Sequence, residues 1–304
     1  METVRHLDPE TIRLFESKGK EGGPATPQVG IANGVKVRRV VQIVRDLAKK
    51  PMKNLRVLDL ACGEGVYSIE TALRGAEVFA LDARTDRMKK GASAAQRLGL
   101  TNLQFEQNDV RRVNITSHGE FDIIYFLGIL YHLDVPDAFH VLENIYEMCR
   151  GLLIIDTHVC LSPQIDVQYK AHTYRGSRWR EHDDDDPEQV RRSRLLSSLD
   201  NTFSFQFTKD SIVRLLVNIG FTSVFECYAP LEPSKPDDRV TLVATKETHV
   251  RLSSYPWVND KTEKDIELTL VQAEKSRDCY CFMHILRLFW RHVCVFWHLI
   301  YKRK

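Results

Sequence analysis

Short apolar runs alternate with amphipathic stretches through the middle of the chain. Five runs indicate buried strands, at Leu55–Leu60, Glu77–Leu81, Leu103–Gln107, Phe121–Leu127 and Leu152–Thr157. Segments of helical length separate them, such as the one from Pro136 to Cys149. Strands that alternate with helices of this length predict an α/β fold with a doubly wound, Rossmann-like parallel sheet and right-handed crossovers.

The pattern changes on both sides of this region. Residues 161–207 form a polar stretch that interrupts the alternation, after which a helix at Lys209–Ile219 and strands at Ser223–Tyr228 and Val240–Thr245 complete the sheet. Upstream, Pro9–Phe15 favours a short helix and Gly19–Gln28 a Gly/Pro linker. Gly34–Lys50 is typical of a helix, with one apolar face made by Val37, Val40, Val41, Val44 and Leu47.

A small-residue turn follows the first predicted strand. Asp59 ends the apolar run, the turn holds Gly63 and Gly65, and a second acid, Asp82, follows at the end of the next strand. This arrangement indicates a nucleotide-type pocket on a parallel sheet. Asp59 and Glu64 would repel the pyrophosphate of a dinucleotide, whereas they suit a ligand that carries an ammonium and a sulfonium. The acids therefore favour S-adenosyl-L-methionine.

This stretch resembles motif I of the class I S-adenosylmethionine-dependent methyltransferases. Ala61 stands where the first glycine of that motif usually stands, and alanine tolerates the turn if its φ stays negative. The resemblance implies that Asp82 accepts hydrogen bonds from the ribose hydroxyls. It also assigns cofactor binding to the positions Asp59, Ala61, Gly63, Gly65, Asp109 (adenine amino group), Val110 (beside the adenine ring) and Leu127 (at the tip of the motif IV strand).

The resemblance also implies the organisation of the whole chain. The family's sheet has seven strands, of which the last is antiparallel. Residues 1–50 would form an N-terminal helical cap, and residues 51–248 the cofactor-binding methyltransferase domain. Within that domain residues 161–207 would be the insertion that shapes the acceptor site. Residues 249–304 would be a C-terminal extension that contains an amphipathic helix.

Methyl transfer from a sulfonium is an in-line displacement, so the protein chiefly holds donor and acceptor together. A hydroxyl acceptor must also lose a proton, and His132, just after the motif IV strand, is the predicted general base. A histidine there could instead only shape the turn. Tyr131 would position the acceptor or pack on the sulfonium, and His158 with Asp156 would join His132 in an acid/base cluster or hold a divalent ion, although no metal site is predicted.

The polar insertion contains side chains suited to gripping an acceptor. Arg178, Trp179 and His182 could bind an anionic or aromatic molecule by forked hydrogen bonds and stacking, or lie in a solvated loop. The net charge of +2 is too small to indicate nucleic acid. Seven cysteines without C-x-x-C pairs argue against a disulfide framework or a zinc site, and no secretory signal pattern is present, so we expect a cytoplasmic protein.

The segment from Asp278 to Lys304 differs from the rest of the chain. On a helix its basic and histidine side chains share a narrow stripe flanked by aromatic residues. Such a helix, over residues 279–301, favours either peripheral contact with a membrane or docking on protein, its own domain or a second copy. The stripe consists of Tyr280, His284, Arg287, Arg291 and His298.

The sequence thus predicts a methyltransferase that acts on a small-molecule or glycan acceptor, through oxygen, with nitrogen also possible. Gly128–His132 followed by Pro136 also resembles bacterial enzymes that modify the wobble uridine of tRNA with S-adenosylmethionine or its carboxylated form. That is the second hypothesis. A catalytically inactive cofactor-binding or membrane-tethered scaffold is the third, and it predicts the loss of pocket acids, yet Asp59, Asp82 and Asp109 are present.

Overall fold

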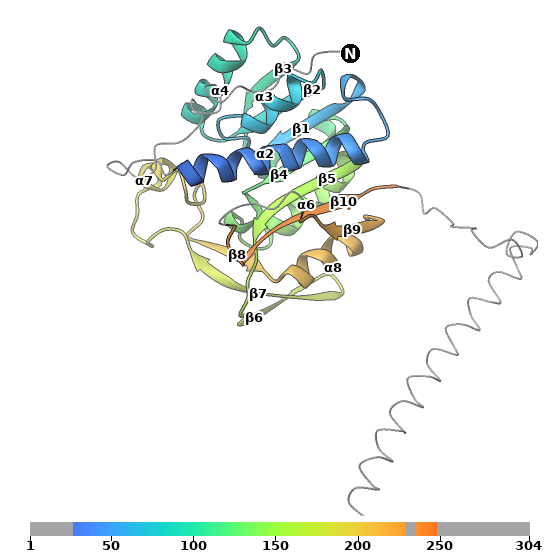
Figure 1. Ribbon diagram of the computed structural model, residues 1–304. Helices are drawn as coiled ribbons and strands as arrows, with labels where there is room; N and C mark the ends of the chain where they lie inside the picture. Colours follow the sequence, from blue (N-terminus) through green and yellow to red (C-terminus); the bar gives the residue numbers. More distant parts are fainter. Residues whose placement is uncertain (1–26, 229–234, 248–304) are drawn as a thin grey trace, which may run out of the picture. The chain divides into compact units, whose positions relative to one another are not determined.

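The computed structural model describes residues 27–228 and 235–247 (Figure 1). The chain divides into two units, residues 1–248 and residues 249–304. The second unit, with its predicted amphipathic helix, lies outside the described residues, and so does the predicted helix at Pro9–Phe15. Among the described helices none combines the length and apolar character that crossing a membrane requires.

The described residues alternate between helices and strands. The α-helices are α2 (Pro27–Leu47), α3 (Val66–Ala72), α4 (Thr85–Arg97), α5 (Ile115–His118), α6 (Asp137–Met148), α7 (Glu188–Ser193) and α8 (Lys209–Ile219). Short 3-10 helices are η1 (Met52–Asn54), η2 (Val110–Arg112) and η3 (Leu130–His132). The strands are β1 (Arg56–Leu60), β2 (Glu77–Asp82), β3 (Leu103–Gln107), β4 (Phe121–Leu127), β5 (Cys149–His158), β6 (Ile165–Tyr169), β7 (His172–Arg180), β8 (Phe203–Phe207), β9 (Ser223–Glu226) and β10 (Arg239–Thr245).

Seven strands form the central sheet in the order β3-β2-β1-β4-β5-β10-β9. Strands β1 to β5 pair in parallel, whereas β10 runs antiparallel to both β5 and β9. The predicted doubly wound sheet with an antiparallel last strand is therefore confirmed. The order reverses between β1 and β4, which is where a parallel sheet opens a crevice for a ligand.

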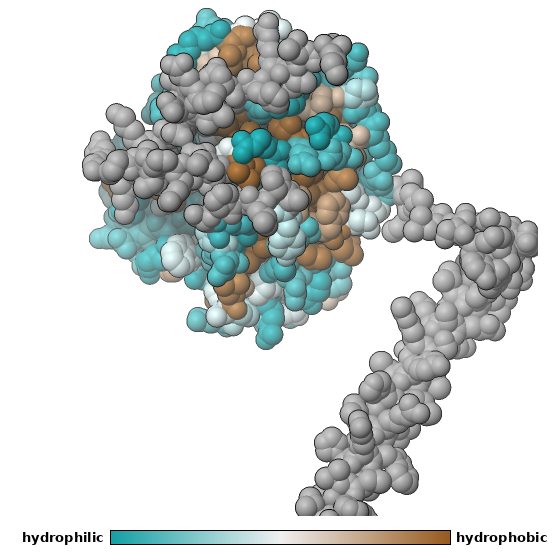
Figure 2. All heavy atoms as spheres, in the orientation of Figure 1, coloured by the Kyte–Doolittle hydropathy of each residue, from teal (hydrophilic) through white to brown (hydrophobic). Residues whose placement is uncertain are grey.

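Helices cover both faces of this sheet (Figure 1). The side chains of β1 alternate, so that Val57 packs in the layer of α2 and α3 while Leu58 and Leu60 pack in the layer of α6 and α8. In α2, Val40 and Val44 are fully buried in the first layer, as the apolar face of the predicted helix requires. Along the face crossed by α2, apolar side chains emerge between polar ones at the surface (Figure 2).

Helix α2 starts earlier than predicted. It begins at Pro27, so Pro27 and Gln28 belong to the helix and not to the Gly/Pro linker. Proline is tolerated in the first turn of a helix because the amide it lacks would have no partner within the helix there.

The insertion has more structure than its polar composition suggests. Strands β6, β7 and β8 form a separate antiparallel sheet, and residues 181–202 link β7 to β8. The alternation Phe203-Ser204-Phe205-Gln206-Phe207 is the sequence signal for β8, and Phe205 and Phe207 are buried in the same core as α6 and α8. The insertion is thus anchored to the main domain by its aromatic side chains.

Candidate active site

A cavity of about 740 Å³ opens at the carboxyl edge of the parallel strands. Residues that follow β1, β2, β3 and β4 line it, together with residues from α2 and from the β7–β8 link. Of the predicted site residues, the structure brings ten to its wall. These are Ala61, Gly63, Glu64, Asp82, Asp109, Val110, Leu127, Tyr131, His132 and Asp156.

The loop after β1 has an unusual backbone. Ala61, Gly63 and Gly65 have φ values of 57°, 59° and 74°, all in the left-handed region. The expectation of a negative φ at Ala61 was therefore wrong, and an alanine held there stores strain of about 1–2 kcal/mol. A Cβ on Gly65 would lie 2.8 Å from the ring of Phe105, so glycine is needed there for space as well as for conformation.

Helix α4 presses directly against this loop through Gly91. A Cβ built on Gly91 would lie 2.3 Å from the backbone oxygen of Glu64. We expect Gly91→Ala to lower the free energy of unfolding by about 1–3 kcal/mol, because helix and loop must separate. The exposed neighbour Ser93 provides the control, and Ser93→Ala should stay within about 0.5 kcal/mol of the wild type in urea denaturation. A Gly91→Ala protein as stable as Ser93→Ala would contradict the close contact.

Asp59 lies beneath the loop and not on the cavity wall. It is 1% exposed, and its Oδ2 accepts a hydrogen bond of 2.5 Å from the hydroxyl of Ser68 on α3. Burial raises the pKa of Asp59 to about 7, and the negative charge of Asp82 adds to this effect. Asp59 therefore fixes the start of α3 under the loop and titrates near neutral pH.

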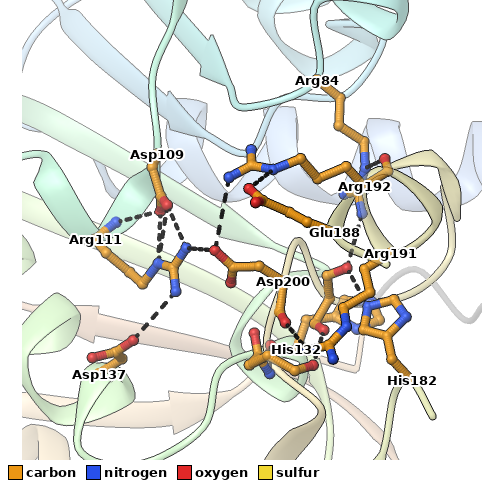
Figure 3. A network of polar contacts seen from close by, with 12 residues as sticks. Arg84, Asp109, Arg111, His132, Asp137, His182, Glu188, Arg191, Arg192 and Asp200 are labelled. Atoms are coloured by element: carbon orange, nitrogen blue, oxygen red, sulfur yellow. Dashed lines mark hydrogen bonds and ion pairs between the residues drawn. The ribbon is translucent and has the colours of Figure 1, made fainter. Parts of the chain in front are cut away.

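Asp82 and Asp109 end neighbouring strands on the cavity wall. The carboxylate of Asp82 accepts the backbone N–H of Gly63 at 2.9 Å and that of Arg84 at 2.8 Å, which ties β2 to the glycine loop. Asp109 is gripped by Arg111, whose guanidinium also reaches Asp200 in the β7–β8 link (Figure 3). Burial alone would raise the pKa of Asp109, but its bonds to Arg111 outweigh burial and lower it. Both acids thus face the cavity as carboxylates fixed by neighbours.

His132 forms a pair that the sequence did not suggest. Its Nδ1 lies 2.9 Å from Oε1 of Glu181, which follows β7 and is 4% exposed. Burial opposes ionisation of Glu181, but its hydrogen bonds to His132 and to the backbone N–H of Ser198 lower its pKa. An ionised carboxylate can only accept, so we assign the proton to Nδ1, which leaves the lone pair of Nε2 for a molecule in the cavity.

His158 is held in a different cluster. Arg239 donates from Nη1 to His158 Nε2 at 2.9 Å, so His158 Nδ1 carries the proton that Asp238 accepts at 2.9 Å. Both nitrogens are engaged, and His158 is not part of the described cavity lining. Its ring packs nearly perpendicular to the ring of Tyr131, with 4.8 Å between centroids, and Tyr131 does line the cavity.

Asp156 lines the same cavity as His132, but its hydrogen bonds are with other residues and not with His132. It is 1% exposed and accepts hydrogen bonds from Lys36, Arg239 and Thr241. Burial would raise the pKa of Asp156, but these cations and bonds lower it. Within residues 27–228 and 235–247, no three His, Cys, Asp or Glu side chains are grouped so that they could hold a metal ion.

The three side chains predicted to grip the acceptor lie off the cavity wall. Arg178 pairs with Asp134, Trp179 is 59% exposed, and His182 is buried with its Nε2 against the backbone oxygen of Ser198. The same insertion supplies other residues to the wall, from the end of the β7–β8 link. These are Leu195, Leu196, Ser197, Ser198, Leu199 and Asn201.

Comparison with known proteins identifies the family of the chain. The family model described as "Methyltransferase domain" matches residues 51–201, which span β1 to β5 and most of the insertion. The chain belongs to the class I S-adenosylmethionine-dependent methyltransferases. The predicted family is therefore confirmed, and S-adenosyl-L-methionine is the cofactor of this family.

Sequence relatives of this methyltransferase include enzymes of ubiquinone biosynthesis. A ubiquinone biosynthesis O-methyltransferase of Psychrobacter cryohalolentis is 27% identical over 113 residues, which cover 36% of this chain and 43% of the relative. The corresponding enzyme of Azorhizobium caulinodans is 27% identical over 165 residues, covering 50% and 62%. The matched region thus spans less than two thirds of the length of either relative.

Solved structures share the fold of the methyltransferase. The N-terminal domain of EvdMO1, crystallised in the presence of SAH and D-fucose, has a TM-score of 0.55 and 18% identity, covering 79% of this chain and 95% of that one. Magnesium protoporphyrin IX methyltransferase from Synechocystis PCC 6803, with bound SAH, has a TM-score of 0.51 and 16% identity, covering 77% and 92%. At these identities the likeness concerns the fold.

The residues of the methyltransferase suit its cofactor. The glycine loop leaves the cavity free of side chains at Gly63, and fixed carboxylates stand at the ends of β2 and β3. Sequence reasoning found these residues because they lie inside one contiguous motif pattern. It missed Glu181 and Arg239, which reach the site from distant parts of the chain and carry no local signal.

Proposed function

We propose that the protein transfers a methyl group from S-adenosyl-L-methionine to an oxygen atom of a small-molecule or glycan acceptor. The observation that carries this proposal is a single cavity lined by Asp82, Asp109 and His132, in which His132 is hydrogen-bonded on its Nδ1 side to Glu181. The relatives named O-methyltransferases support an oxygen acceptor. The structural neighbour EvdMO1, crystallised in the presence of D-fucose, makes a sugar one of the acceptors to test.

Each group of the cavity has a distinct task in this mechanism. S-adenosylmethionine would supply an electrophilic methyl group on its sulfonium and would leave as the neutral thioether when the S–CH3 bond breaks. Asp82 would hold the ribose hydroxyls, and Asp109 would hold the adenine amino group. Tyr131 and Leu127 narrow the cavity beside His132 and exclude water from the acceptor.

His132 acts on the acceptor hydroxyl. Its Nε2 accepts the proton as the oxygen attacks, and Glu181 stabilises the imidazolium that results, because the carboxylate lies 2.9 Å from Nδ1. Glu181 is itself fixed by the backbone N–H of Ser198 at 2.9 Å. The pair thus supplies a base whose ring orientation is set before the acceptor binds.

The first test is cofactor binding. Asp82→Ala removes the acceptor for two ribose hydroxyls, each charge-assisted bond being worth about 1.5–3 kcal/mol, so calorimetry should show a Kd for S-adenosylhomocysteine raised about 100-fold or more. Asp86→Ala deletes an exposed carboxylate four residues later and should leave the Kd within about twofold. The thermal unfolding temperatures of Asp82→Ala and Asp82→Asn show whether a raised Kd reflects lost contacts with the cofactor or an unfolded glycine loop, because Asp82 also holds the backbone of Gly63 and Arg84. An absence of binding by the wild type would favour the inactive scaffold.

The second test identifies the acceptor. Cofactor carrying a labelled methyl group is incubated with catechol, with D-fucose, with a metabolite extract and with total tRNA. Label on a hydroxyl compound supports the proposal. Label confined to tRNA, with binding that weakens steeply as salt is raised, would instead support the wobble-uridine hypothesis.

A further inference from the structure

Arg84 lies two residues beyond the acid predicted to bind ribose and clasps the β7–β8 link. Its Nε donates a hydrogen bond of 3.3 Å to the backbone oxygen of Arg192, as Figure 3 shows. Its Nη2 lies 3.0 Å, 2.9 Å and 3.0 Å from the backbone oxygens of Arg194, Ser197 and Ser198. Four carbonyls of the link thus converge on one guanidinium, whose planar set of donors suits such a task better than a lysine ammonium does.

The β7–β8 link connects Arg84 to the His132–Glu181 pair through hydrogen bonds. The backbone oxygen of Ser198 accepts from Arg84, while its backbone N–H donates to Glu181 Oε2 at 2.9 Å. Glu181 Oε1 then accepts from His132 Nδ1 at 2.9 Å. On the other side, the backbone N–H of Arg84 donates to Asp82 at 2.8 Å. A continuous series of hydrogen bonds therefore joins Asp82 to His132 through Arg84, Ser198 and Glu181.

We propose that Arg84 is a positioning residue that couples the cofactor end of the cavity to the general base. Arg84 fixes the β7–β8 link through its hydrogen bonds to the backbone oxygens. The backbone N–H of Ser198 in that link then orients Glu181, and Glu181 stabilises the Nδ1–H tautomer of His132. This inference rests on the proposed role of His132 as base. It also explains why residues 195–199 and Asn201 line the cavity while the same segment contacts the ends of β2 and β3, through Arg84 and through the ion pair of Arg111 with Asp200.

Arg87 offers a matched control one helical turn away. It also lines the cavity, yet among the hydrogen bonds of the described residues it makes only a long contact of 3.5 Å with the backbone oxygen of Leu195. Arg84→Met and Arg87→Met remove the same charge from the same wall. Arg84→Lys keeps the charge without the planar set of donors.

The experiment measures the tautomer of His132 in the full-length protein, in the absence of any acceptor. Nitrogen-15 NMR of the histidine side chains, with His132 assigned by its loss in His132→Gln, should show the Nδ1–H tautomer in the wild type and in Arg87→Met. We expect that signal to be lost in Arg84→Met, as in Glu181→Leu, which leaves no acceptor opposite Nδ1, and partly restored in Arg84→Lys. The Kd of S-adenosylhomocysteine in Arg84→Met should change less than about threefold.

Kinetics supply a second readout, on whichever of catechol and D-fucose the wild type methylates. Arg84→Met should lower kcat about 10- to 100-fold, and Arg84→Met combined with Glu181→Gln should lower it no further than Glu181→Gln alone, because both act through one series of contacts. If the double variant instead shows the product of the two single-variant losses in kcat, or if a folded Arg84→Met protein keeps the His132 signal unchanged, the coupling is overturned. If the wild type methylates nothing, the proposed function fails, while the NMR result still decides the coupling.

Discussion

Replacing His132 by glutamine is expected to lower kcat for methyl transfer to a hydroxyl by about 10²–10⁴-fold, the usual range for losing a general base. Glutamine keeps a polar side chain of similar length that can still meet Glu181 but has no nitrogen able to take a proton. The cofactor should bind nearly as before, because none of its predicted contacts is with His132. Transfer of labelled methyl under saturating cofactor measures kcat, and calorimetry with S-adenosylhomocysteine measures binding.

His140 provides the control for this substitution. It is an exposed histidine on α6, and His140→Gln should leave kcat within about twofold of the wild type. Glu181→Gln should fall between the two, since it keeps the base but removes the charge that stabilises its protonated form. Equal kcat in His132→Gln and His140→Gln would argue against proton abstraction by His132 and would indicate an acceptor that reaches the site already ionised.

Much of the fold could be predicted because its determinants are local. Strands β1, β2, β4, β5 and β10 contain short apolar runs. The elements Leu103–Gln107, Phe121–Leu127 and Lys209–Ile219 have the predicted bounds. The antiparallel last strand came from the family resemblance. The insertion was harder, since β6 and β7 are polar strands whose pairing depends on β8 and on an aromatic core far away in the chain.

The candidate site divides in the same way. Asp82 ends the apolar strand β2, so its position at the sheet edge can be read from the sequence, whereas the place of Asp109 two residues after β3 was implied by the family resemblance. The partner of His132 lies 49 residues away, and no spacing rule connects Glu181 to it. Arg178 and Trp179 illustrate the converse error: both are chemically suited to binding, but they lie on β7 with their side chains outside the cavity lining. Only tertiary structure separates these cases.

Asp59→Asn is expected to change the pH dependence of stability. Burial raises the pKa of Asp59 to about 7, well above the ordinary value of an aspartate, so the folded protein keeps a proton that the unfolded chain releases. For a carboxyl whose pKa is raised on folding, the stability it contributes is fully present below about pH 4 and is lost as the pH rises to about 7. At about 1.36 kcal/mol per pH unit, the wild type should lose on the order of 3 kcal/mol through this group between pH 5 and pH 8.

Asparagine cannot ionise, so it removes this loss while its amide oxygen can still accept from Ser68. The free energy of unfolding of Asp59→Asn minus that of the wild type, from urea denaturation, should therefore rise by on the order of 3 kcal/mol from pH 5 to pH 8. Asp46→Asn, at an exposed site on α2, should give a flat difference. A flat difference for Asp59→Asn as well would mean that this carboxyl ionises as freely in the folded protein as in the unfolded chain. Burial of Asp59 beneath the glycine loop would then not lower the free energy of unfolding at neutral pH. The left-handed backbone at Ala61 would be the remaining feature of this loop that lowers stability at a binding site.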